Sequence, residues 1–275
     1  MIYMGKYSNI DEMRDLFSIK GLVAVVTGAA SGIGQGIAFA WAANGGKLVI
    51  SDINEDGLKE TEREIRSVTN DVVSVVADVT KLDDVKRLVN ESVRAFGNID
   101  ALYIVPGINI RKSILSYTYD EFERVLRVNL WGTYYLLKEF GNVMIKNPRG
   151  GSIVLISSIR HLVVEPGQSA YAATKAAMVQ LAKTAAAEWA KYNIRVNVIA
   201  PGVVETELTQ QIKKDPAWYE AYRTKPALKR WATVREIAGP AIFLATPAAS
   251  YITGTVIYVD GGWTAIDGRY EPNIP

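Results

Sequence analysis

The stretch LVAVVTGAASGIG, residues 22–34, joins a short apolar run to a glycine-rich turn, and this junction decides the fold. The run is almost continuous in apolar residues, which is typical of a parallel strand covered on both faces. Gly28 permits a tight turn, Gly32 lets the backbone approach a phosphate, and Gly34 lets the following helix pack closely on the strand. The free N–H groups at the start of that helix predict a pyrophosphate site.

Similar apolar runs recur along the chain, separated by longer stretches with a helical pattern. Strands are expected at residues 22–27, 47–51, 72–77, 101–105, 152–157, 194–200 and 255–260. Helices are expected near residues 33–44, 54–68, 81–96, 119–145, 169–191 and 233–245. This alternation predicts an α/β fold, a doubly wound parallel sheet of about seven strands with helices on both faces.

No linker, charge block or repeat divides the 275 residues. We therefore expect one domain over residues 21–265, preceded by an N-terminal arm (1–20) and followed by a C-terminal tail (266–275). The segment 203–232 interrupts the alternation with charges, aromatic residues and two prolines. It predicts a flap over a substrate site, with a solvated helical hairpin as the alternative.

Composition restricts the function classes. The 31 basic and 29 acidic residues nearly balance, so neither nucleic acid nor a membrane surface is an expected partner. The chain has no cysteine and a single histidine, His161, which argues against a metal site and a Ser-His-Asp hydrolase. With no signal peptide and no run long enough to span a membrane, we expect a soluble, cytoplasmic protein.

Asp52 ends the second expected strand, eighteen residues after Gly34. A carboxylate there accepts hydrogen bonds from the adenosine ribose hydroxyls and repels a 2′-phosphate. Ser31, Ile53 and Asn54 supply no compensating cation, so NAD is favoured over NADP. The alternative is an ordinary aspartate that caps the next helix.

QSAYAATK, residues 168–175, places Tyr171 and Lys175 one turn apart on an expected helix, where they share a face. A free phenol has a pKa near ~10, and a neighbouring ammonium favours its ionised form. The pair therefore indicates a phenol whose ionised form is favoured by the lysine. The alternative is an amphipathic helix whose aromatic residue packs inward while its lysine reaches water.

Taken in chain order, these stretches resemble the short-chain dehydrogenase/reductase family and imply a Rossmann fold over residues 18–265. The resemblance is carried by TGAASGIG (27–34), Asp78-Val79, Asn129 in RVNLWGTYY, Ser158 in VLISSI, YAATK (171–175), PGVVET (201–206) and YITGTVIYVDGGW (251–263). One departure is Ile104-Val105-Pro106-Gly107, which stands where the family has Asn-Asn-Ala-Gly. Gly107 is kept, and apolar packing must replace the asparagines.

The resemblance implies a role for each matching residue. Tyr171 is the acid/base for a substrate hydroxyl, with its pKa lowered by Lys175 and the positive nicotinamide. Ser158 holds the substrate oxygen, and Asn129 positions a water that leads from Lys175 to solvent. Asp78 contacts the adenine, unless it is only a loop acid. The implied cofactor-binding residues are Gly28, Ser31, Gly32, Ile33, Gly34, Asp52, Ile53, Asp78, Val79, Gly107, Tyr171, Lys175, Pro201, Gly202, Val204 and Thr206.

Within the family, four stretches are most similar to gluconate 5-dehydrogenases and related sugar-acid or polyol dehydrogenases: GINIRKS (107–113), AAEWAKYNIRVN (186–197), KPALKRW (225–231) and VDGGW (259–263). Arg111 is then expected to grip a substrate carboxylate, unless it is a surface charge. The implied substrate residues are Arg111, Ser158, Arg160, His161 and Tyr171.

The expected reaction is hydride transfer between NAD and a secondary alcohol or ketone of a sugar acid or polyol. A 3-oxoacyl thioester reductase or a broad-range carbonyl reductase would use the same catalytic set. A dinucleotide-sensing binding protein is the non-enzyme alternative. The long small-residue faces of helices 119–145 and 169–191, together with the resemblance, imply a homotetramer.

Overall fold

The computed structural model describes residues 13 and 15–267 of the 275-residue chain. In that part, seven strands form one parallel sheet in the order β3-β2-β1-β4-β5-β6-β7. The expected doubly wound sheet is thus confirmed. Its strands are β1 (Val23–Thr27), β2 (Lys47–Asp52), β3 (Val72–Val76), β4 (Ala101–Ile104), β5 (Gly151–Ile156), β6 (Ile194–Pro201) and β7 (Val256–Val259).

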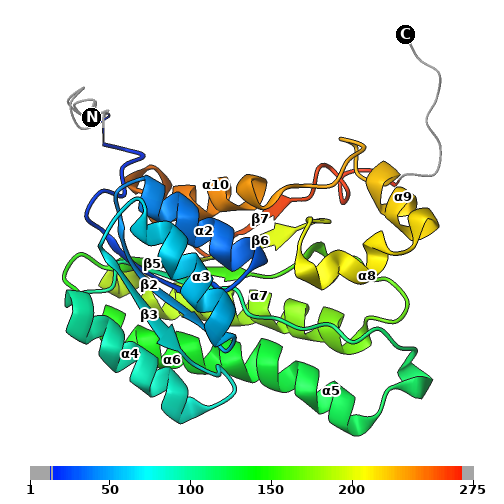
Figure 1. The fold of residues 1–275 in the computed structure, drawn as a ribbon, viewed down its shortest axis with the longest axis horizontal. Coiled ribbons are helices and arrows are strands. Elements are labelled where there is room, and N and C mark those ends of the chain that lie inside the picture. Colours follow the sequence, from blue (N-terminus) through cyan, green and yellow to red (C-terminus); the bar gives the residue numbers. More distant parts are fainter. Residues whose placement is uncertain (1–12, 14, 268–275) are drawn as a thin grey trace, which may run out of the picture.

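Helices cover both faces of the sheet (Figure 1). Successive side chains of a strand point to opposite faces, so Ala24 and Leu48 enter one buried core while Val25 and Val49 enter the other. The first core is closed by α2 (Gly32–Ala43), α3 (Glu55–Arg66) and α10 (Val234–Ala245). The second is closed by α4 (Leu82–Phe96), α6 (Gly132–Met144) and α7 (Ser169–Trp189).

The expected helix 119–145 is divided in three. It comprises α5 (Tyr119–Leu126), a π-helical turn (Arg127–Trp131) and α6. The turn holds the buried Asn129, whose carbonyl accepts a hydrogen bond from the Thr133 hydroxyl at 2.7 Å. Wide turns of this kind are frequent at functional sites, and this one aims Asn129 at the loop after β4.

The strand order reverses between β1 and β4. The chain proceeds from β1 to β2 and β3 on one side, and from β4 to β5, β6 and β7 on the other. In open α/β sheets, a crevice forms outside the carboxyl ends of the strands at such a switch point. The fold therefore predicts the location of a ligand site.

The segment 203–232 is largely helical. It contains a 3₁₀ turn (Glu207–Thr209), α8 (Gln210–Lys213) and α9 (Pro216–Thr224), and both helices lie beyond the carboxyl ends of the strands (Figure 1). Its own small apolar cluster comprises Val203, Ile212, Tyr222 and Trp231. The segment is thus folded, and its expected role as a flap over a substrate site stays a prediction.

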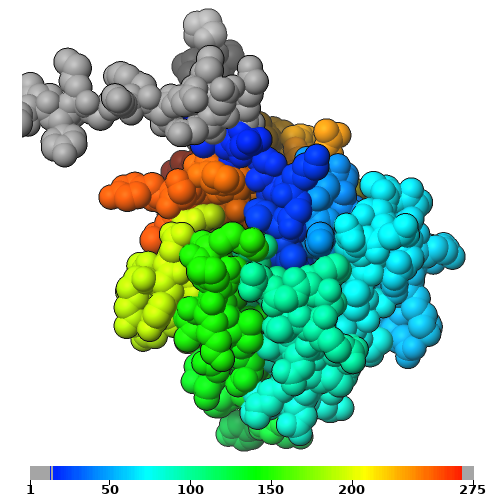
Figure 2. All heavy atoms as spheres, turned by 90° about the vertical axis from the view of Figure 1, so that its left-hand side faces the viewer, coloured from blue at the N-terminus to red at the C-terminus, as the bar shows by residue number. Residues whose placement is uncertain are grey.

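The described part of the N-terminal arm packs on the domain. Ile19 is buried in the core under α2, and Phe17 lies 6.4 Å from Phe243 between ring centres. Figure 2 shows this dark-blue segment beside the orange one that contains α10. The rest of the arm and residues 268–275 of the expected tail lie outside the described residues. No helix in the described ranges is long and apolar enough to cross a bilayer.

Candidate active site

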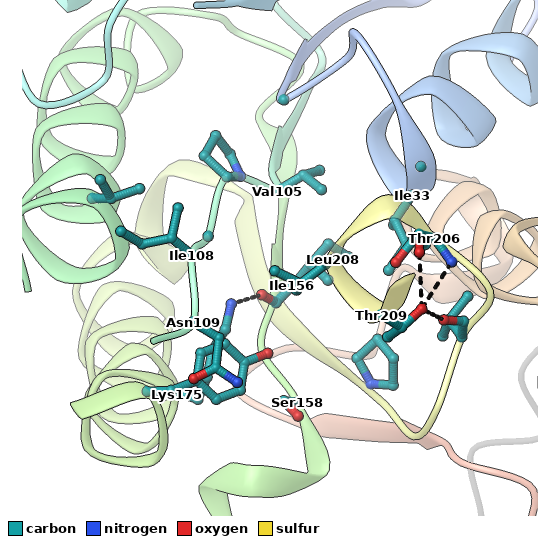
Figure 3. A pocket seen from close by; sticks show the side chains of 18 of the residues that line it. Ile33, Val105, Ile108, Asn109, Ile156, Ser158, Lys175, Thr206, Leu208 and Thr209 are labelled. Carbon is teal, nitrogen blue, oxygen red and sulfur yellow. Dashed lines mark hydrogen bonds between the residues drawn. The ribbon is translucent and has the colours of Figure 1, made fainter. Parts of the chain in front are cut away.

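A cavity of about 700 Å³ runs along the carboxyl ends of the strands, from the glycine turn to α9. In Figure 3, Ile33 and Thr206 lie on one side of it and Lys175 and Ser158 on the other. The structure brings nearly all of the expected cofactor residues to this cavity, with Gly34 behind its wall. Those that line it are Gly28, Ser31, Gly32, Ile33, Asp52, Ile53, Asp78, Val79, Gly107, Tyr171, Lys175, Pro201, Gly202, Val204 and Thr206.

The glycine turn has the geometry that a dinucleotide needs. Gly28 and Gly32 have φ angles of +71° and +54°, which side-chain-bearing residues rarely adopt. A Cβ atom on Gly34 would lie 2.0 Å from the carbonyl oxygen of Gly28, so helix and strand meet without room for a side chain. The backbone at the start of α2 is therefore open to a pyrophosphate.

Asp52 joins this turn to the end of β2. Its Oδ2 accepts a hydrogen bond from the Ala30 N–H at 3.1 Å, and its Oδ1 accepts one from the Asn54 N–H at 2.9 Å. Asn54, rather than Asp52, caps α3 by accepting from the Gly57 N–H at 3.2 Å. The carboxylate is thus held in place on the cavity wall. The glycine turn and this acid together fit a nicotinamide dinucleotide.

Tyr171 and Ser158 meet at the middle of the cavity. Burial raises the pKa of Tyr171, while a hydrogen bond with Ser158 and the positive charges of Arg160 and Arg111 lower it. In the chain without a cofactor, burial outweighs the groups that oppose it, and Lys175 is not among those groups. The expected lowering of this pKa by Lys175 and the nicotinamide together stays a prediction.

Lys175 is almost fully buried, and its Nζ donates a hydrogen bond to the Ile156 carbonyl at 2.8 Å. Burial lowers the pKa of Lys175 from 10.5 to about 8, since an ammonium loses hydration there. A Cβ atom on Gly107 would lie 3.2 Å from the same Nζ. The retained glycine therefore leaves space for the lysine.

Asn129 does not line the cavity. Its Oδ1 accepts from the Ile108 N–H at 2.8 Å, and its Nδ2 donates to the Ile108 carbonyl at 3.0 Å and to the Thr174 hydroxyl at 3.1 Å. Asn129 thus fixes the loop after β4 against α7. Its expected role in holding a water stays a prediction.

Apolar packing replaces the missing asparagines, as expected. Pro106 lies against the glycine turn, because a Cβ atom on Gly28 would be 3.2 Å from the Pro106 nitrogen. Val105 packs on the core under α2. The loop after β4 is therefore held by the packing of Val105 and Pro106, and by the hydrogen bond from the Ile108 N–H, one residue beyond Gly107, to Asn129.

Arg111 and Arg160 line the far end of the cavity, so Arg111 is not an isolated surface charge. Each lies 3.1 Å from the same oxygen of Glu165. Each guanidinium also lies over a tryptophan ring, Arg111 at 4.9 Å from Trp218 and Arg160 at 5.5 Å from Trp263. Two cations are thus held in place on this part of the cavity wall.

His161 does not belong to the pocket, which corrects the expectation. Its Nδ1 lies 2.7 Å from the Ser158 carbonyl, and its Nε2 lies 3.0 Å from the Tyr258 hydroxyl. Its ring stacks on Tyr258, with centres 5.5 Å apart. The 3₁₀ turn that follows Ser158 directs Arg160 inward and His161 toward β7.

Several residues of the site were not predicted from the sequence. Asn109 lines the cavity with a buried Oδ1 that has no hydrogen-bond partner within the described ranges. Tyr222 and Trp263 also line it, and Glu165 holds the arginines from outside. The aromatic density of PAWYEAY (216–222) was an available signal for Tyr222. Nothing in the sequence distinguishes Glu165 from other loop acids.

Known proteins match the chain over most of its length. A family model described as enoyl-(acyl carrier protein) reductase matches residues 28–264. A 3-oxoacyl-(acyl-carrier-protein) reductase of Thermotoga maritima is 35% identical over 89% of this chain and 98% of its own. A 2-dehydro-3-deoxy-D-gluconate 5-dehydrogenase of Escherichia coli is 33% identical over 90% of this chain and 98% of its own.

Among solved structures, a gluconate 5-dehydrogenase of Burkholderia cenocepacia in complex with NADP and tartrate superposes with a TM-score of 0.88. It is 33% identical, and the match covers 92% of this chain and 98% of that one. With this fold, this cavity and these relatives, the chain belongs to the short-chain dehydrogenase/reductase family of nicotinamide-dependent oxidoreductases.

Proposed function

We propose that this oxidoreductase transfers hydride between NAD and a secondary alcohol or ketone of a sugar acid. One observation carries the proposal: a single cavity is lined by the glycine turn and Asp52 at one end, by Tyr171 and Ser158 in the middle, and by two arginines at the other. This order matches a dinucleotide, a reacting hydroxyl and a carboxylate laid end to end.

The nicotinamide ring, when bound, supplies the site that takes or gives the hydride. Tyr171 then removes the proton from the substrate hydroxyl, or returns it to the ketone oxygen in the reverse direction. Ser158 holds that oxygen by a hydrogen bond. Lys175, held by Ile156, would bind the nicotinamide ribose and add positive charge near the phenol.

NAD rather than NADP is supported by Asp52. Its carboxylate is fixed by two backbone N–H groups, and a 2′-phosphate beside it would meet like charge. No arginine or lysine is present at Ser31 or Ile53, which line the same end of the cavity.

A sugar acid is supported by the two arginines and by Asn109. Guanidinium groups recognise carboxylates through paired hydrogen bonds. The unpartnered Oδ1 of Asn109 is an acceptor suited to a substrate hydroxyl, because a buried acceptor without a donor is costly. A substrate with a carboxylate and several hydroxyl groups would pair with the two arginines and with the Oδ1 of Asn109.

A 3-oxoacyl thioester reductase is the second candidate, since the Thermotoga maritima relative carries that name. It would share Tyr171, Ser158 and Lys175 and would favour NADPH. A pure dinucleotide sensor would need neither the tyrosine nor the lysine.

The test is a panel of gluconate, neutral polyols, simple alcohols and a 3-oxoacyl thioester, each assayed with NAD(H) and NADP(H). Arg111→Ala should lose activity selectively on the carboxylate substrates. Lys112→Ala is the matched control, because this neighbouring cation pairs with Glu121 and does not line the cavity. Activity confined to the thioester with NADPH, or equal loss on neutral alcohols, would overturn the assignment.

We also propose a homotetramer in the cytoplasm. Trp131 and Tyr134, beside each other at the start of α6, are about half exposed and offer an apolar contact for a second copy. Sedimentation that shows a monomer at micromolar concentration would contradict this.

A further inference from the structure

Glu165 stands behind the substrate end of the cavity as the common partner of four side chains. Its Oε2 accepts from Arg111 and Arg160 at 3.1 Å each, and also from Gln168 and Tyr222. All four partners line the cavity, whereas Glu165 itself does not. Glu165 therefore acts on the pocket through the residues that it holds.

The four partners come from separate parts of the fold. Arg111 follows β4, Arg160 follows β5, Gln168 precedes α7 and Tyr222 belongs to α9. The loop that carries Glu165 is fixed as well, since the Gly167 carbonyl accepts a hydrogen bond from the Lys112 N–H at 3.0 Å. One carboxylate thus ties the flap helix to both arginine-bearing loops.

The charge of the arginine–glutamate cluster (Arg111, Arg160 and Glu165) is +1, from two guanidiniums and one carboxylate. A guanidinium has five N–H donors, and the contacts to Glu165 engage one Nη nitrogen on each arginine. Donors and one unit of positive charge therefore remain for a ligand. Three acids line the cavity elsewhere. Asp52 and Glu207 lie at the glycine turn, and Asp78 follows β3, three strands away from β4 in the sheet.

We propose that Glu165 sets the charge preference of the substrate pocket, so that the pocket takes a sugar monocarboxylate in preference to a dicarboxylate or a neutral polyol. This inference rests on the proposed function and names its substrate class. Glu165 is a positioning residue: it partly neutralises the arginines and orients their remaining donors toward one carboxylate. The tryptophans behind the guanidiniums restrict their turning.

The test uses three six-carbon ligands that differ in charge: glucitol (neutral), gluconate (one carboxylate) and glucarate (two). The variants form a charge series in which Arg160→Gln gives a cluster charge of 0, Glu165→Gln gives +2, and the double variant R160Q/E165Q returns it to +1. Glu220→Gln on α9 is the matched control, because Glu220 is exposed and pairs with Arg223.

The wild-type protein should prefer gluconate. Glu165→Gln should raise the glucarate-to-gluconate ratio of kcat/KM at least tenfold, through KM rather than kcat, because a nearby unit charge adds that much to anion binding. Arg160→Gln should lower the ratio, the double variant should return it to within about threefold of wild type, and Glu220→Gln should leave it unchanged. A ratio that stays constant across the series, or a double variant that behaves like Glu165→Gln, overturns the inference.

Calorimetric binding of the same three ligands to NAD-saturated protein separates the two proposals. Binding that follows the charge series without turnover supports the inference and rejects the sugar-acid dehydrogenase. Turnover with a constant glucarate-to-gluconate ratio supports the sugar-acid dehydrogenase and rejects the inference about Glu165. If none of the three ligands binds, both proposals are rejected. Should Glu165→Gln fail to fold because it leaves two cations facing each other, Arg160→Gln and the double variant still decide.

Discussion

The Nζ atom of Lys175 lies 5.5 Å from the centre of the Tyr171 ring while it donates a hydrogen bond to the backbone of β5. The lysine is therefore held by the sheet rather than by the tyrosine. In the chain without a cofactor, burial is the main influence on the pKa of the Tyr171 phenol, and Lys175 is not among the groups that shift it.

Tyr171→Phe should reduce kcat by at least about 10²-fold, because general acid–base catalysis contributes that much. Cofactor affinity should change by less than about threefold, since the ring remains. Cofactor absorbance during turnover and calorimetric titration with NAD measure the two quantities. Tyr192→Phe, outside the cavity, is the control, and undiminished turnover in Tyr171→Phe would contradict the mechanism.

Lys175 should make stability depend on pH above about 8. Its pKa is about 8 in the folded chain and near 10.5 when unfolded, so the unfolded state binds more protons between these values. This group's contribution to the free energy of unfolding therefore rises with pH across that window. Below pH 8 the burial of its charge costs the most.

Urea unfolding of wild type and Lys175→Met between pH 7 and 10 measures this contribution, because other titrations cancel in the difference. The free energy of unfolding of the wild type should rise relative to that of Lys175→Met as the pH rises. Lys183→Met, at an exposed position of the same helix, should show a flat difference. A flat difference for Lys175→Met as well would show that its burial carries no such cost.

Asp52→Asn should shift cofactor preference toward NADP. The amide keeps the size of the side chain and removes the charge that repels a 2′-phosphate. The NAD-to-NADP ratio of kcat/KM should fall by roughly tenfold or more, since each tenfold step corresponds to about 1.4 kcal/mol. Asp71→Asn, before β3 and outside the cavity, should leave the ratio alone. Wild-type protein that already prefers NADP would reject the role given to Asp52.

Gly34→Ala should destabilise the protein by about 1–3 kcal/mol, because overpacking a tight contact costs that much and the new methyl would overlap the Gly28 carbonyl. Gly239→Ala, in the middle of α10 with open space around it, is the matched control. Its effect should stay below about 1 kcal/mol, because the gain in helix propensity is opposed by the contact of the new methyl group with the ring of the following Pro240. Thermal unfolding of both variants checks the contrast. Equal effects would mean that the glycine turn has more room than its geometry indicates.

Local sequence determined the sheet, the glycine turn and the placement of Tyr171 and Lys175 on one helix. Apolar runs of strand length with helices between them suffice to specify a parallel sheet, and the Tyr171–Lys175 spacing places both residues on one helix turn. The boundaries of the expected strands and helices differ from the observed ones by only a few residues, apart from the π-helical turn around Asn129. That turn has no hydrophobic periodicity of its own, and the contacts that Asn129 makes from it, with Ile108 and Thr174, join segments that are distant in the sequence.

Only the tertiary structure decided which side chains meet at the arginine-lined end of the cavity. Glu165 and Arg111 are far apart in the chain, and their contact depends on how the loops after β4 and β5 meet α9. Likewise, the orientation of His161 away from the pocket follows from its contact with Tyr258 on β7. Periodicity specifies which face of an element is buried, whereas charge pairing between loops depends on distances that only the assembled fold sets.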